Sequence, residues 1–431
     1  MNVVEKYTIT DKLVDQINAL QLPLWGSAYR KAAIESFKKQ GVPNRKNEEY
    51  KYCKIDLILK DGFVFNSTKK ITTEQLNKVN VLKDAITIVI VNGVFDASLS
   101  SLKDLPKGLI VCDIKEASEK HKPVFEKHYS KYADINTDPF IALNTATATG
   151  GAFIHIEKNT VVETPIHILH VSTTNENSII NPRNLMVVEK SAQAKIVESF
   201  VTIDTTANVF NNALTEIAVD EQANIQHYKL QDEQEFGHLV NTTQIQLEKQ
   251  SVFSTHNISL AGSFIRNNLN IILNNEGIES HLFGLYITNN EQVIDNHTLV
   301  DHQKPNCNSN ELYKGIVDGE SAATFNGKIF VRKDAQKTNA FQSNKNILLS
   351  DDGTVNTKPQ LEIFADDVKC SHGTSTGKLD EEKIFYLRTR GLSETSAKKL
   401  LMFAFASEVL NDIKIESLKE YLEERILKVF Q

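Results

Sequence analysis

The sequence predicts a mixed α and β chain whose core, residues 136–364, is a parallel β-helix between a mostly helical N-terminal domain (residues 1–135) and a helical C-terminal domain (residues 365–431). Three observations predict this. The central region contains short apolar runs separated by polar turns, and few of these runs are long enough for a helix. A short unit recurs along the same region, whereas helical patterns lie before and after it. At 431 residues the chain also exceeds one ordinary core, so two or three domains are expected.

The N-terminal domain is predicted from mixed signals. A helix is expected over residues 24–41, where apolar residues recur at helical spacing until Gly41 ends the pattern. The charged, tyrosine-rich segment RKNEEYKYCKI (45–55) is expected to cap the next domain. Two apolar runs within residues 85–112 predict short strands, and a polar, lysine-rich helix is expected over residues 114–132.

The recurring unit is a pair of mostly apolar residues, a polar residue, two more residues and a small residue. The small residue is expected in the turn, where a Cβ would clash, and the polar residue can bond the backbone of the turn. Such a strand–turn–strand unit is typical of a solenoid, and without helices in the period the solenoid is a β-helix. An antiparallel sandwich is the competing arrangement. One long interval predicts an insertion, residues 289–315, in a surface loop. The units are HIEKNT (155–160), VVEKSA (187–192), AVDEQA (218–223), QLEKQS (246–251), ILNNEG (272–277), IVDGES (316–321) and LLSDDG (348–353), with the polar position at Glu157, Glu189, Asp220, Glu248, Asn274, Asp318 and Ser350, which by subtraction are 32, 31, 28, 26, 44 and 32 residues apart.

The C-terminal domain is predicted to contain three helices. The first starts after Asp380 and stops at Gly391, and the second is capped by Ser393. The middle of the second helix, LLMFAFA (400–406), is apolar almost all round, so it is buried on more than one side, either within its own domain or against a partner. The third helix carries Leu418, Leu422 and Ile426 on one stripe.

Charge and cysteine content exclude several classes of protein. The net charge of −7 and the pI near 6.0 argue against a nucleic-acid binder, which needs a basic surface. The N-terminus shows no secretory pattern, and no apolar run is long enough to span a membrane, so a cytoplasmic protein without membrane contact is expected. The spacing of the four cysteines argues against a disulfide framework, a zinc finger and a self-contained iron–sulfur site: Cys53, Cys112, Cys307 and Cys370.

The stretch ADDVKCSHGTSTGKLD (365–380) places Cys370 and His372 two residues apart. The sequence predicts that residues 361–370 run as a strand into a loop, and that Gly373 turns the backbone. Side chains two apart on a strand share a face, so the thiol and the imidazole could bind one metal ion or transfer a proton. A cysteine packed beside a histidine at a domain junction is the simpler interpretation. A cysteine hydrolase would need a third group, for which only Asp366 or Asp367 is at hand.

Two long segments around this motif resemble the SufB/SufD family of iron–sulfur cluster assembly proteins. They run from SNELYKG to NILLS (309–350) and from KPQLEIF to ASEVL (358–410). Weaker similarity covers RKNEEYKY and DPFIALNTATATGGAFIHI (138–156). Val-Lys-Cys-Ser-His-Gly at residues 368–373 resembles SufD-like chains, whereas SufB-like chains usually carry His-Glu-Ala there and have further cysteines. GTSTGKLD (373–380) departs slightly from the more usual Gly-Ala-Thr after the histidine.

This resemblance implies a right-handed parallel β-helix between two helical domains, and it implies partners. The β-helix would pair with a SufB-like scaffold across its last strands, and the C-terminal helices would dock a SufC-like ABC ATPase through a region that includes Leu400, Leu401, Phe403 and Phe405. A complex with one SufB and two SufC is the family expectation, and the isolated chain could form a homodimer. Cys370 and His372 would then lie at the SufB interface and hold a transient iron–sulfur cluster together with SufB ligands. A reduced flavin is a candidate component of such complexes, although the sequence has no flavin motif.

Three functions compete at this point. The first is a non-catalytic assembly subunit that contributes His372 and Cys370 to a shared cluster site. The second is a β-helix lyase or esterase acting on polysaccharide, which would need a secretion signal and aromatic platforms, whereas the chain has one tryptophan, Trp25. The third is a purely structural subunit in which the pair only packs. The chain has no Gly-x-x-x-x-Gly-Lys-[Ser/Thr] loop, so it is not expected to hydrolyse ATP.

Overall fold

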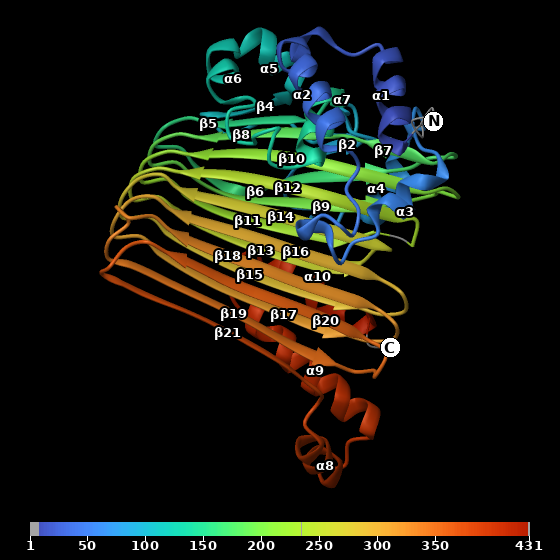
Figure 1. Ribbon diagram of the computed structural model, residues 1–431, viewed down its shortest axis with the longest axis vertical. Helices are drawn as coiled ribbons and strands as arrows, with labels where there is room; N and C mark the ends of the chain where they lie inside the picture. The colour runs from blue at the N-terminus through green and yellow to red at the C-terminus, as the bar shows by residue number, and fades with distance from the viewer. Residues whose placement is uncertain (1–7, 234, 430–431) are drawn as a thin grey trace, which may run out of the picture.

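The computed structural model describes residues 8–233 and 235–429, and its centre is the predicted parallel β-helix (Figure 1). Two sheets face each other, and the chain crosses between them after nearly every strand, so each coil gives one strand to each sheet. Neighbouring strands within a sheet are parallel and in register through most of the stack. The fold class predicted from the repeat is therefore confirmed, and the antiparallel sandwich is excluded.

The strands divide cleanly between the two sheets. The first sheet contains β1 (Val64–Phe65), β4 (Leu109–Asp113), β5 (Ala152–Ile156), β7 (Ser178–Ile180), β8 (Arg183–Val188), β10 (Val209–Val219), β12 (Gly237–Leu247), β14 (Phe264–Leu273), β16 (Val293–His302), β18 (Ala322–Val331) and β20 (Thr354–Ile363). The second contains β2 (Ile86–Val91), β3 (Val94–Phe95), β6 (Val161–Ser172), β9 (Gln193–Thr202), β11 (Asn224–Asp232), β13 (Val252–Ala261), β15 (Glu279–Thr288), β17 (Asn308–Val317), β19 (Thr338–Leu348) and β21 (Val368–Gly377).

Stacked columns of side chains fill the lumen of the solenoid. Because parallel strands pair in register, alternate residues of each strand point inward and stand directly above their counterparts in the next coil. One such column is aliphatic and buried over five coils: Ile217, Ile245, Ile271, Val300 and Ile329. Burial of a side chain of this size contributes roughly 1.5–3 kcal/mol, so the stack depends on neighbouring coils for its stability.

The coils follow one another without the predicted insertion. At one rim each turn bonds to the turn before it: the Asn274 amide donates to the Leu247 carbonyl and the Gln303 amide to the Leu273 carbonyl, at 3.0 and 3.2 Å. The turn that follows Asn274 on this rim is therefore at Gln303, 29 residues later by subtraction. Residues 289–315 hold β16 and most of β17, which pair in register with the strands on both sides, so the prediction of a surface insertion is wrong.

The recurring unit changes rim at this point, which explains the error. The turn at residues 303–307, QKPNC, does not carry the unit. Asp318 carries it on the opposite rim, where its amide donates to the Thr288 carbonyl at 2.9 Å, and Ser350 follows on that same rim. Cys307, which was expected in the insertion, is fully buried.

The small residue of the unit also differs from its expected role. Ala192 and Ala223 are buried, and the residues before them, Ser191 and Gln222, take the left-handed backbone conformation with φ of 58°. In these two units the residue is small because its side chain points into the crowded coil, whereas Gly277 itself takes the left-handed conformation with φ of 71°, as the turn interpretation expects.

The N-terminal region covers the first coils of the solenoid. The predicted helix over residues 24–41 is present as a 3₁₀ turn (Leu24–Gly26) followed by α2, which ends before Gly41. The two predicted strands are β2 and β4, and the expected helix over residues 114–132 is divided into α5 and α6. The helices of this region are α1 (Ile9–Ala19), α2 (Ser27–Gln40), α3 (Ile55–Ile58), α4 (Thr73–Val79), α5 (Ile114–Lys120), α6 (Lys122–His128) and α7 (Pro139–Thr147), with 3₁₀ turns at Glu48–Tyr50 and Leu59–Asp61.

Three helices follow the last coil, as predicted. They are α8 (Glu381–Thr389), capped by Asp380, α9 (Glu394–Leu410), capped by Ser393, and α10 (Glu416–Val429). Figure 1 shows α9 and α10 lying along the solenoid and α8 projecting beyond its last coil. Apolar side chains of α9 and α10 pack on the outer face of the second sheet, and the expected stripe of α10 is buried: Leu418, Leu422 and Ile426. None of the helices in the described ranges is long and apolar enough to cross a membrane.

Candidate functional site

Cys370 and His372 lie on β21, the last strand of the solenoid (Figure 1). The sequence predicted that residues 361–370 run as a strand into a loop and that the backbone turns at Gly373. A strand does run into a turn here, but the turn comes before Cys370, and the prediction for Gly373 is wrong. β20 ends at Ile363, residues 364–367 form the turn, and β21 continues through Gly373. The pair therefore sits within a regular strand at the open end of the β-helix.

The two side chains share a face, as their spacing predicted, and that face is the lumen. In the register of β19 and β21, Cys370 stands opposite Ala340 and His372 opposite Gln342. Ala340 and Gln342 are both buried inside the preceding coil. The thiol and the imidazole thus continue two interior columns to the point where the solenoid stops.

The end position leaves the pair accessible. Cys370 is half-buried and packs beside Val368 and Leu361, whereas His372 is exposed. Partial burial raises the pKa of the Cys370 thiol. A raised pKa keeps a thiol protonated near neutral pH, which is the opposite of an activated cysteine nucleophile.

Among the residues that the structure describes, the surroundings of this pair do not form a complete metal site. Within residues 8–233 and 235–429, no group of three or more histidine, cysteine or carboxylate side chains is arranged to hold a metal ion. Asp366 and Asp367 are exposed in the turn before β21, and Asp367 uses its backbone to bond Lys337 and Gln336. The pair therefore offers one thiol and one imidazole at an accessible end of the solenoid.

The apolar segment of α9 that was expected to meet a partner is divided between two surroundings. Phe403 and Phe405 pack against the cluster between α9, α10 and the second sheet, and the ammonium group of Lys314 lies 4.2 Å from the centre of the Phe405 ring. Leu401 is half-buried, and Leu400 is 47% exposed. Most of this segment thus packs on its own chain.

A second exposed apolar pair was missed from the sequence. Phe385 and Tyr386 of α8 are 68% and 56% exposed, whereas the preceding Ile384 is buried. Four successive apolar or aromatic residues, 384–387, cannot all face inward on one short helix, and this run was the available signal. Phe385, Tyr386 and Leu400 are thus the exposed large apolar side chains of α8 and α9, and we refer to them as the accessible apolar surface of these helices.

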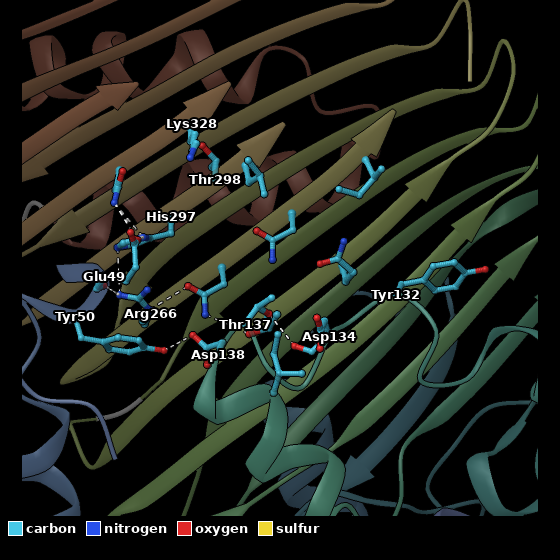
Figure 2. Close-up of a pocket in the computed structure, with 18 of the residues that line it drawn as sticks. Glu49, Tyr50, Tyr132, Asp134, Thr137, Asp138, Arg266, His297, Thr298 and Lys328 are labelled. Atoms are coloured by element: carbon cyan, nitrogen blue, oxygen red, sulfur yellow. Dashed lines mark hydrogen bonds and ion pairs between the residues drawn. The ribbon is translucent and has the colours of Figure 1, made fainter. Parts of the chain in front are cut away.

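A groove of about 430 Å³ lies between the N-terminal segment and the outer face of the first sheet (Figure 2). Its best-defined feature is Arg266 of β14, which is buried. The Cζ atom of its guanidinium lies 3.9 Å from the centre of the Tyr50 ring. Arg266 donates to the Asp295 carboxylate at 2.5 Å, and the Cys53 thiol donates to the same carboxylate at 2.7 Å. The Nε2 atom of His297 lies 2.9 Å from the other carboxylate oxygen of Asp295.

The charges in this groove neutralise one another. Burial alone would raise the pKa of Asp295, but His297 and Arg266 hold that pKa well below its usual range. Burial raises the pKa of Cys53, so this thiol remains a hydrogen-bond donor. The cluster thus fastens the segment 45–55 onto the solenoid, which supports its predicted capping role.

A second buried charged cluster occupies the lumen. The Glu198 carboxylate contacts the Lys229 ammonium at 3.2 Å, His227 at 3.1 Å and His170 at 3.5 Å. Burial would raise the pKa of Glu198, but Lys229 and the two histidines hold it well below its usual range. Every member is enclosed, so this cluster fixes the interior of these coils and is not open to a ligand.

Comparison with known proteins agrees with this architecture. The family model described as "SUF system FeS cluster assembly, SufBD core domain" matches residues 170–405, and the SufBD N-terminal region matches residues 7–168. A SufBD family protein of Synechocystis is 32% identical over 406 residues, covering 92% of this chain and 89% of its own length. The iron–sulfur cluster assembly protein SufD of Escherichia coli is 30% identical, covering 91% and 90%. SufD of Bacillus subtilis is 24% identical, covering 93% of each chain.

Proposed function

This chain belongs to the SufBD family of the SUF iron–sulfur cluster assembly system, and we propose that it is the SufD-type, non-catalytic subunit of the assembly scaffold. One observation carries the proposal: Cys370 and His372 face the lumen at the open end of the β-helix, without further ligands from the described residues. The nascent cluster, which is the cargo of the system, would take these two ligands from this chain and the others from a SufB-like partner. Histidine in place of cysteine raises the reduction potential of an iron–sulfur cluster. A site shared between two subunits also suits a cluster that must be transferred to another protein.

His372→Ala tests this function in the co-purified complex. The complex is supplied with iron and sulfide under anaerobic conditions, and cluster formation is followed by visible absorption. We expect the complex to remain intact and the absorption to be lost. Ser371→Ala is the matched control, since Ser371 lies on the opposite face of the same strand and should leave the absorption unchanged. Normal absorption with His372→Ala would leave the chain a purely structural subunit.

The proposed SufB contact is the open end formed by β20 and β21. These two strands end their sheets within the described residues, and an uncovered strand edge presents backbone groups for pairing with another chain. Most residues of β21 are exposed. Thr374→Lys would place a charge on the lumen side of this end, and we expect it to abolish co-purification with SufB while ATPase binding persists. The same end would support a homodimer when SufB is absent.

The proposed docking site for a SufC-like ATPase is the accessible apolar surface of α8 and α9. Leu400 was predicted for this contact, and the exposure of Phe385 and Tyr386 extends it to α8. Phe403 and Phe405 would act by holding α9 against the solenoid, and the half-buried Leu401 would remain part of the docking region.

Charged substitutions on α8 test this docking site. Phe385→Asp combined with Tyr386→Asp should abolish ATPase co-purification, and Leu24→Asp, at a residue that is 87% exposed on the N-terminal domain, is the control. Retention of the ATPase by the double variant would contradict this assignment.

A charged link joins the proposed ATPase-docking helix to the strands beside the cluster site. Glu408 of α9 pairs with Lys314 of β17 and with Lys345 of β19, the latter at 3.6 Å. Lys314 also donates to the Phe405 carbonyl at 2.8 Å. Since β21 pairs directly with β19, ATP-driven movement of α9 would reach the open end through these contacts.

The remaining parts of the proposal follow from this role. The chain would bind neither nucleic acid nor membrane, and it would contribute no ATP site of its own. We assign no residue of this chain to a flavin. Its four cysteines are all free, which suits the reducing cytoplasm that we propose as its location.

A further inference from the structure

His372 is the last residue of an interior column, and the residues at the same position in the two preceding coils are polar. In the register of the second sheet, Glu311 of β17 pairs with Gln342 of β19, and Gln342 pairs with His372 of β21. Glu311 and Gln342 are 4% and 3% exposed. Successive strands lie about 4.8 Å apart, so the side chains of such a column are within hydrogen-bonding reach of their neighbours.

Glu311 fixes the amide of Gln342. The Gln342 nitrogen Nε2 donates to the Glu311 carboxylate oxygen Oε2 at 2.7 Å. This bond assigns the nitrogen of the amide to the side of β17, and the oxygen is left as an acceptor. Among the described residues, no donor reaches the Gln342 oxygen Oε1, which is buried. A buried carbonyl oxygen without a donor costs free energy, so such an atom calls for a partner.

The opposite sheet leaves space for this amide. Gly327 of β18 faces Gln342 across the lumen, and a Cβ at residue 327 would lie 2.3 Å from the Gln342 Nε2 atom. Any larger residue at this position would displace the amide. The packing around Gln342 thus holds its amide in one place, and His372 occupies the next position of the same column.

An imidazole that binds a metal through one nitrogen commonly donates its other N–H to a fixed acceptor, which selects the tautomer and the ring orientation. We propose that Gln342, backed by Glu311, is a positioning residue that accepts a hydrogen bond from the imidazole of His372. The Gln342 oxygen lacks a donor, and His372 is the neighbouring residue of the same column, so an N–H of the imidazole would supply that donor and would itself gain a fixed acceptor. The inference rests on the proposed function, because a fixed orientation of the imidazole matters for cluster assembly only if His372 binds the cluster.

The tautomer of His372 is the direct measurement. The full chain is labelled with ¹⁵N-histidine, and the His372 resonances are assigned by their loss in His372→Gln. The ¹⁵N shifts of the two ring nitrogens give the ratio of tautomers. We expect one dominant tautomer in the parent chain and a shift of the ratio by about fivefold in Gln342→Met, which keeps the length of the side chain and removes the acceptor.

Matched variants separate positioning from packing. Thr374→Val changes the next interior position of β21 and should leave the tautomer ratio unchanged. Glu311→Gln keeps an oxygen that accepts from Gln342, so its ratio should stay near that of the parent chain. Equal populations of both tautomers in the parent chain would overturn the inference without any variant, and so would an unchanged ratio in Gln342→Met.

Cluster formation distinguishes the failure of this inference from the failure of the proposed function. In the complex, Gln342→Met should slow cluster formation while subunit composition is unchanged. Loss of the cluster in His372→Ala together with an unaltered tautomer in Gln342→Met would retain the function and refute the positioning role. A normal cluster in His372→Ala together with an altered tautomer would retain the hydrogen bond and refute the function.

Discussion

The buried Glu311 should make the free energy of unfolding depend on pH. Burial raises the pKa of its carboxyl from 4.5 to about 7, so the folded chain holds this proton more tightly than the unfolded chain does. The contribution of Glu311 to stability is therefore most favourable below about pH 4.5 and is lost as the pH rises to 7. The difference between the two pKa values corresponds to about 3 kcal/mol at pH 8.

Glu311→Gln removes this cost and keeps the shape of the side chain and an acceptor for Gln342. The variant should lie closest to the parent chain at the acid end of the series and exceed its stability by up to about 3 kcal/mol at pH 8. For a chain of 431 residues, this corresponds to a rise in Tm of roughly 3 °C. Thermal unfolding at pH 5, 6, 7 and 8, followed by circular dichroism, measures the difference.

The control for this experiment is Glu420→Gln, which changes an exposed glutamate of α10. It should leave the Tm unchanged across the series. Parallel curves of Tm against pH for Glu311→Gln and the parent chain would refute the assignment of a raised pKa, since the cost of ionising Glu311 would then be absent. A lower Tm of the variant at pH 8 would show that the charged carboxylate stabilises the lumen.

Three further predictions concern other parts of the molecule. Ile271→Ala should cost about 2–5 kcal/mol because it opens a cavity within the aliphatic column, and urea unfolding should show a loss larger than that of an exposed isoleucine. Tyr50→Leu removes the ring over Arg266, worth about 0.5–2 kcal/mol, and limited proteolysis should cut the segment 45–55 faster; an unchanged rate would contradict the fastening role. Glu408→Gln should speed amide hydrogen exchange in α9, because Glu408 pairs with Lys314 of the solenoid; unchanged exchange would show that apolar packing alone holds the helix.

The sequence could predict those parts of the fold that depend on local patterns. Continuous apolar runs located β2 and β4, and the caps Asp380 and Ser393 located the starts of α8 and α9. The register of the coils was harder, because turns occur on both rims and either kind can carry the same short unit. The unit jumped from one rim at Asn274 to the other at Asp318, which produced a false insertion.

The site was predictable to the same extent. The spacing of Cys370 and His372 placed them on one face, since this property needs only two neighbouring residues of a strand. The column behind them could not be located without the register, because Glu311 and Gln342 lie 61 and 30 residues before His372 by subtraction. The correct coil length would have aligned all three. The exposure of α8 depends on how far this helix projects from the last coil, and no local pattern encodes that distance.

The two ends of the solenoid differ: one is closed by antiparallel strands, and the other leaves a strand edge unpaired beside Cys370 and His372. At the first end, β3 and β4 pair antiparallel with β2 and β5, which closes the stack. Solenoids generally require such terminal caps. At the other end, β21 leaves one edge unpaired within the described residues, and its lumen side chains include Cys370 and His372. A partner that covers this edge would remove an aggregation-prone surface and supply the missing ligands in one step. If the proposed function holds, the cluster site would be complete only in the assembled complex, and the purified free subunit should then not retain iron.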